Sequence, residues 1–161
     1  AIYKSDGVDA VNLFPSKFIT VFCVGTVAVG DVVELDFSAT RSTNQTVDAF
    51  GISVKKAAAT DNLPLACGVA TEAITSLPSG VTGFYIKIQY AGYCNTVTPD
   101  AAIAVGLPVG SDAGTAGRIQ AFTGNVSATA GFFGVVVDAY VTGAGTNDGA
   151  IFLIDKGFFN A

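Results

Sequence analysis

The chain has 161 residues, of which half are apolar and 13% are charged, with a formal net charge of −5 and no histidine. This composition excludes an intrinsically disordered chain, because the apolar surface is large enough for its burial to offset the entropy lost on folding. Lys55-Lys56 is the one basic pair among eight basic residues. Direct nucleic-acid binding needs clustered cations, so we expect none. No apolar run reaches the roughly 18 residues of a membrane-spanning helix, so we expect no membrane partner.

The first seventeen residues differ from the rest and predict an N-terminal arm, followed by one domain over residues 18–161. The apolar side chains of this arm are Ile2, Tyr3, Leu13 and Phe14. An extended arm can add a strand to the edge of a neighbour's sheet, so we expect these four residues to contact a partner. An ordinary edge strand packed on its own domain is the alternative. The opening AIYKSDGVDA contains no apolar signal region, and we expect synthesis in the cytoplasm.

Strands dominate the expected secondary structure, because β-branched residues are abundant while glutamate occurs twice and methionine never. In VVELDF (Val32–Phe37), apolar residues alternate with Glu34 and Asp36, which we expect on a solvated face. The glycine-rich Val109–Gly117 predicts a flexible loop. The predicted strands are, in chain order, Phe18–Val24, Val32–Phe37, Ala49–Lys55, Cys67–Ile74, Phe84–Tyr90, Gly117–Phe122, Phe132–Val141 and Ala150–Asp155.

Short strands separated by turns at this spacing predict an all-β fold with little helix, either a barrel or a sandwich. Two phrases recur along the chain and suggest two similar halves, although chance similarity in so Val-, Gly- and Ala-rich a chain is the alternative. ACGVATEAI at Ala66–Ile74 returns as FFGVVVDAY at Phe132–Tyr140. AVGDVV, which begins at Ala28, returns as AVGLPV, which begins at Ala104.

Gly68 and Gly134 hold the same place in the longer of the two repeated phrases. A glycine inside a strand commonly marks a bulge, a bend or the close approach of another backbone. We therefore predict that both glycines are structurally required and belong to no ligand site.

Catalytic chemistry is not recognisable in the sequence. Without histidine, neither a Ser-His-Asp or Cys-His arrangement nor an imidazole metal site can form. Cys23, Cys67 and Cys94 lack zinc-binding spacing and have apolar or aromatic neighbours. They predict buried free thiols of a reducing compartment, and one disulfide plus a spare thiol is the alternative. We expect no cofactor, no metal and no enzyme activity.

Three further residues are candidates for contacts with a partner. Arg41 lies in the polar stretch SATRSTNQT, where a solvated loop arginine is the alternative. Phe158 and Phe159 stand close to the C-terminus. Aromatic rings are costly to leave in water, so we expect both of them to dock on another surface.

The order of several motifs resembles that of the capsid cement, or head-decoration, proteins of tailed phages. The motifs are GDVVELD, AFGISVKKAAATDN, LACGVATEAI, GFYIKIQYAGYC, VGLPVG and FFGVVVDAY, and the match covers roughly Gly30–Asp138. They consist largely of Gly, Val and Ala turns, and the two chain ends have no clear equivalent in the family pattern.

The resemblance implies a β-rich knob on the outer surface of a virion, often trimeric, that binds the major capsid protein and stabilises the head. Many weakly bound copies can stabilise a shell through multivalency, without any catalysis. The alternative expectation is a non-catalytic β-sandwich module of a phage fibre that recognises a carbohydrate or a receptor. The sparse Tyr cluster and the absence of Trp make an aromatic sugar-binding platform harder to identify.

Overall fold

The computed structural model describes residues 16–37, 53–122, 131–137 and 149–159. It is essentially all-β with a closed β-barrel core, which confirms the predicted fold class. The nine strands in these ranges are β1 (Lys17–Val24), β2 (Val32–Asp36), β3 (Ser53–Lys56), β4 (Ala66–Ala70), β5 (Gly83–Val97), β6 (Pro108–Ser111), β7 (Ile119–Ala121), β8 (Gly134–Val136) and β9 (Gly149–Leu153).

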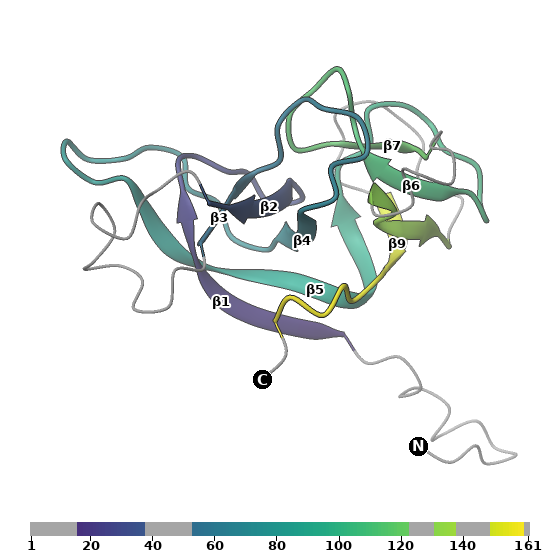
Figure 1. Cartoon of the computed structure of the whole chain (residues 1–161), viewed down its shortest axis with the longest axis horizontal. Helices are drawn as coiled ribbons and strands as arrows, with labels where there is room; N and C mark the ends of the chain where they lie inside the picture. The colour runs from purple at the N-terminus through teal and green to yellow at the C-terminus, as the bar shows by residue number, and fades with distance from the viewer. Residues whose placement is uncertain (1–15, 38–52, 123–130, 138–148, 160–161) are drawn as a thin grey trace, which may run out of the picture.

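The described residues between 17 and 90, which we call the first half, form a closed ring of strands. Their order is β1-β3-β2-β4-β5, and β5 pairs with β1 to close the ring. The β1–β5 ladder is the longest and runs antiparallel, whereas β1 and β3 are parallel. Figure 1 shows β1 and β5 curving together along one side of the molecule.

The described residues between 91 and 153, which we call the second half, form a second ring that shares β5 with the first. The later part of β5 pairs with β9, and β9, β8, β6 and β7 follow in order. A parallel bridge from Pro99 to Ile119 of β7 closes this ring. The equivalent pair in the first half is Cys23 and Val54, also parallel partners. β5 therefore belongs to both rings.

Backbone hydrogen bonds in the second half repeat those of the first. The Gly30 amide donates to the Ala70 carbonyl at 2.9 Å, and the Gly106 amide donates to the Val136 carbonyl at 2.8 Å. Both glycines have positive φ, +90° and +86°, which L side chains rarely adopt. The repeated AVG phrase is thus a repeated turn.

The side chains on the outside of the two rings also correspond. In each half, one row of cross-strand partners crosses four strands in the same register. The rows are Val32, Val69, Gln89 and Phe18 in the first half and Pro108, Val135, Phe152 and Tyr93 in the second. The two similar halves predicted from the repeated phrases are confirmed.

Each half has its own apolar core, and the cores share corresponding positions. In the first half these include Val33, Val54, Ala70 and Ile88, and in the second Val109, Ile119, Val136 and Ile151. All three cysteines are buried and free, as expected. Burial is the main cause that raises the pKa of Cys23 to about 11 and that of Cys67 to about 12.

The structure corrects the predicted loop at Val109–Gly117, whose first part is strand β6. Val109 is a core residue, and the Ser111 hydroxyl accepts the Leu63 amide at 2.7 Å and donates to the Thr60 carbonyl at 2.8 Å. These partners lie far away in sequence, so the local abundance of glycine concealed the strand. Only the residues after β6 form the turn, in which the Asp112 carboxylate accepts the Gly114 amide at 2.9 Å.

The expectation that Glu34 and Asp36 face solvent is wrong, because both residues are buried. Lys55 lies directly across from Glu34 on β3, and its Nζ is 3.7 Å from a carboxylate oxygen of each acid. The Ala58 amide also donates to Glu34 at 3.1 Å. The outward-pointing acids of β2 are therefore buried beside Lys55, because a charge can be buried where an opposite charge compensates it.

Gly68 and Gly134 lie at equivalent points of close backbone approach. A Cβ on Gly68 would be 2.8 Å from the carbonyl oxygen of Gln89, and a Cβ on Gly134 would be 2.6 Å from that of Phe152. Real Cβ atoms essentially never approach backbone oxygens this closely, and backbone cannot rotate away as a side chain can. At each site, a side chain would push β5 or β9 out of register.

We predict that Gly68→Ala and Gly134→Ala each lower the free energy of unfolding by about 1–3 kcal/mol, the usual cost of overpacking. Urea unfolding of the purified variants measures this cost. Gly114→Ala is the matched control, because its Cβ would be 3.4 Å from the nearest atom, a carboxylate oxygen of Asp112. That variant should stay within about 0.5 kcal/mol of the parent. If Gly68→Ala or Gly134→Ala is as stable as the parent, the strands do not approach as described.

Candidate interaction surface

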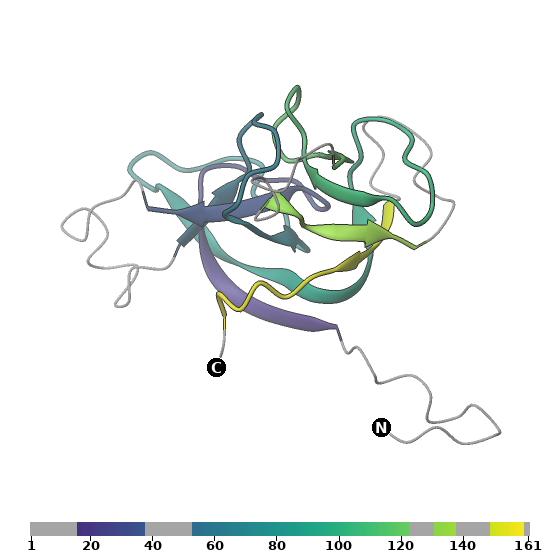
Figure 2. The ribbon, with the colours of Figure 1, turned by 45° about the vertical axis from the view of Figure 1, so that its right-hand side comes forward.

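The chain after β9 forms a tail, residues 154–159, that returns from the second half along β5 and β1 (Figures 1 and 2). Lys17 of β1 forms an ion pair with Asp155 at 3.2 Å, and the Lys156 ammonium donates to the Pro64 carbonyl at 3.2 Å. Burial lowers the pKa of Lys156 to about 8. The tail therefore fastens the second half to the first.

The tail ends with one aromatic ring inside the protein and one outside. Phe159 is 6% exposed and belongs to the core of the first half, where its ring centroid is 5.3 Å from that of Tyr90. Phe158 is 36% exposed. The expectation that both rings dock on a partner thus needs correction: Phe159 packs within its own chain, and only Phe158 remains on the surface.

We predict that Phe159→Ala destabilises the protein by about 3–5 kcal/mol, the range found when a buried phenylalanine is truncated. The neighbouring Phe158→Ala is the matched control and should cost clearly less than Phe159→Ala, because Phe158 is 36% exposed and Phe159 only 6%. Thermal and urea unfolding give both values. Equal losses for the two variants would contradict the position of Phe159 in the core.

Three aromatic side chains and one lysine lie on the outside of the β1–β5 ladder and form what we call the aromatic face. They are Phe18, Phe22, Tyr85 and Lys87. Phe22 and Tyr85 are direct cross-strand partners with ring centroids 5.4 Å apart in an edge-to-face arrangement. The Lys87 ammonium lies 5.6 Å from the centre of the Phe18 ring. Phe18 is 48% exposed and Tyr85 59% exposed, so a partner can reach both rings.

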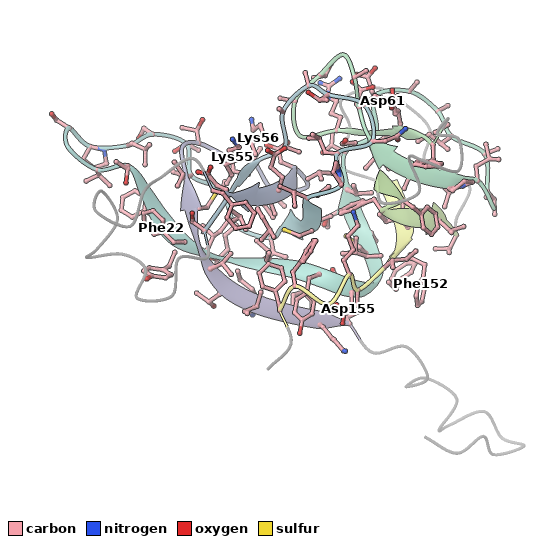
Figure 3. The ribbon with its side chains drawn as sticks, in the orientation of Figure 1. Phe22, Lys55, Lys56, Asp61, Phe152 and Asp155 are labelled. Carbon is pink, nitrogen blue, oxygen red and sulfur yellow. The ribbon has the colours of Figure 1, made fainter. Side chains whose placement is uncertain are left out.

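The register of β1 against β5 creates the aromatic face. Alternate residues of each strand point outward, while Val21 and Cys23 of β1 and Ile86 and Ile88 of β5 point into the first core. Figure 3 shows Phe22 and Phe152 toward opposite ends of the molecule, where β5 pairs first with β1 and then with β9. The paired strands β1 and β5 thus hold the side chains of the aromatic face in fixed positions.

Charged side chains in the described residues serve mainly to join elements. Beside the Lys55 contacts, Lys56 pairs with Asp31 at 3.1 Å, and Arg118 pairs with Asp100 at 3.0 Å. None of these pairs lies on the aromatic face. Their arrangement points to structural linkage of neighbouring segments.

Two kinds of reactive group, a metal-binding cluster and a nucleophilic thiol, can be assessed in the described residues. They contain no group of three or more acidic, cysteine or histidine side chains that could hold a metal ion. Burial raises the pKa of all three thiols, so they remain protonated and poorly nucleophilic at neutral pH. Within the same part of the chain, no helix is long and apolar enough to cross a membrane.

The remaining contact residues named from the sequence lie outside the described residues. These are Ile2, Tyr3, Leu13, Phe14 and Arg41. The aromatic face was not identified from the sequence. Both strands were predicted, but their pairing, which brings Phe22 beside Tyr85, depends on contacts distant along the chain.

No protein-family model and no curated protein matches the sequence of this chain. The function is therefore inferred from the sequence motifs and the geometry of the surface.

Proposed function

We propose that the chain is a structural virion protein, a capsid cement protein that binds the outer surface of the major capsid lattice and stabilises the head. The observation that carries the proposal is the aromatic face, with two well-exposed rings on a rigid β-framework. The motif order across Gly30–Asp138, which resembles that of head-decoration proteins, supports it as well.

The physical demands on a cement protein agree with this framework. Such a protein must keep its shape under the strain of a filled shell and bind through surface area, without chemistry. Two closed rings that share one long strand provide a stiff body, since closure leaves few free edges. Exposed aromatic rings provide binding energy, because burying one is worth about 1.5–3 kcal/mol.

Self-association is part of the proposal, and a trimer around a local symmetry axis of the shell is the form that we favour. A chain with 13% charged residues has little polar surface with which to cover itself. Cyclic contacts between copies cover apolar surface without leading to open-ended aggregation.

We predict that the purified chain co-sediments with expanded empty capsids of its phage and raises the temperature at which they break. The double variant Phe18→Ser, Tyr85→Ser should bind at least about tenfold more weakly, because about 1.4 kcal/mol of lost binding energy is enough for that change. Binding by the parent should persist at high salt, since it depends on apolar contact.

The matched control is Val81→Ser, which removes a residue that is also exposed and apolar but lies outside the aromatic face. It should bind as the parent does. A parent chain that stays in the supernatant would contradict the proposed function. Full occupancy by the double variant would show that the aromatic face is not the binding surface.

Recognition of a carbohydrate or receptor by a fibre module is the second candidate, and the same aromatic face favours it. Exposed rings such as Phe18 and Tyr85 can stack against the apolar faces of sugars. A glycan array probed with the parent and with the double variant separates the two functions. Specific glycan binding that is lost in the variant, together with no capsid binding, would favour the fibre module.

A further inference from the structure

One outer surface of the first half is sealed by the second half. Four of its side chains are fully buried and belong to the core of the second half, namely Val32, Ala57, Ala66 and Val69. Backbone hydrogen bonds hold this contact. The Val32 amide donates to the Gly117 carbonyl at 2.8 Å, and the Gly117 amide donates to the Ala57 carbonyl at 2.9 Å.

The repeat shows which residues occupy the same surface in the second half. Pro108 and Val135 correspond to Val32 and Val69, because both are direct cross-strand pairs in equivalent strands. Phe122 corresponds to Ala57, since its amide donates to the Pro108 carbonyl at 2.8 Å as that of Ala57 does to Val32 at 2.9 Å. The repeated phrase aligns Phe132 with Ala66.

The corresponding surface of the second half is buried less completely. Pro108, Phe122, Phe132 and Val135 are all half-buried, although their four counterparts are fully buried. The Phe122 and Phe132 rings pack edge to face with centroids 6.1 Å apart. Phe122 and Phe132 thus occupy the positions at which the smaller Ala57 and Ala66 of the first half contact the second half.

The turn beside this surface shows the same contrast. Val105, Leu107 and Val137 are 55%, 44% and 41% exposed. Their counterparts in the first half are Val29, Asp31 and Thr71, none of which is as open to solvent. Asp31 is buried and its carboxylate is held by Lys56 at 3.1 Å, whereas Leu107 presents an apolar side chain to solvent.

Seven uncharged side chains on β6, β8 and their flanking turns form what we call the second-half face. They are Val105, Leu107, Pro108, Phe122, Phe132, Val135 and Val137. Contiguous apolar surface of this kind marks an interface. The equivalent surface of the first half is already used as one, inside the same chain.

We propose that the second-half face binds a further copy of this chain, through the same face of that copy, around a symmetry axis. A head-to-tail continuation of the internal contact is closed off. In the internal contact, Leu153 lies in the same core cluster as Val32 and Val69 of the first half. The equivalent residue of the first half is Tyr90, and Phe159 of the tail already packs against it. A second copy therefore cannot repeat the contact at this position. Copies related by one rotation axis bring their equivalent faces together at that axis, so second-half faces can cover one another there, and such closed assemblies do not grow further.

This inference deepens the self-association part of the proposed function, and it can be tested without capsids. The double variant Leu107→Asp, Val137→Thr gives the second half the residues that the first half has at the same positions. The repeated backbone accepts these residues in the first half, and both positions are exposed in the second, so the variant should fold. Sedimentation velocity across a range of concentrations measures association, and circular dichroism checks the fold.

We expect the parent to self-associate and this double variant to raise the dissociation constant on the order of a hundredfold, because two apolar contacts are lost on every copy at the interface. Val81→Asp, which places a carboxylate on an exposed apolar position of the first half, is the matched control and should associate as the parent does. If the double variant fails to fold, Leu107→Ser, Val137→Thr replaces it, with a weaker effect in the same direction.

A monomeric parent, or a folded variant that associates as tightly as the parent, would overturn the inference. Failure of the proposed function would look different, because it would appear as a parent that self-associates normally but does not sediment with capsids.

Discussion

The rest of the structure depends on β5, a single strand of 15 residues that must complete two rings. Its first part is hydrogen-bonded to β1 and β4, and its later part to β9. Because one strand cannot shift its register in one ring without moving the other, the two halves are mechanically coupled. The tail reinforces this coupling when it places Phe159 in the first core.

Duplication explains both the regularity of the molecule and its asymmetry. Two equivalent rings place equivalent side chains on their outer surfaces. The contact between the rings uses this surface of the first half and not the equivalent surface of the second. The first half buries Val32 and Val69 in this contact, whereas the second half leaves Pro108 and Val135 partly open. A chain built from two like halves therefore has one surface that its described residues leave partly open, and we propose that this surface mediates self-association.

Runs of β-branched and apolar residues between turns were enough to predict most strands, because these patterns are local. The repeated phrases were enough to find the two halves, and the structure places Gly68 and Gly134 against equivalent backbone oxygens. Burial of Glu34 and Asp36 could not be read in this way, since it depends on Lys55 in a strand far away in sequence. Strand β6 and the place of Phe159 were hidden for the same reason.

Nuclear Overhauser effects across the strands test the shared-strand, two-ring architecture most directly. The account predicts contacts between Val33 and Gly68 and, in the same register, between Val109 and Gly134, with Pro99 close to Ile119. Observation of all three contacts in one solution species would support it. The first contact without the other two would contradict it, because the second half would then not form a ring on β5.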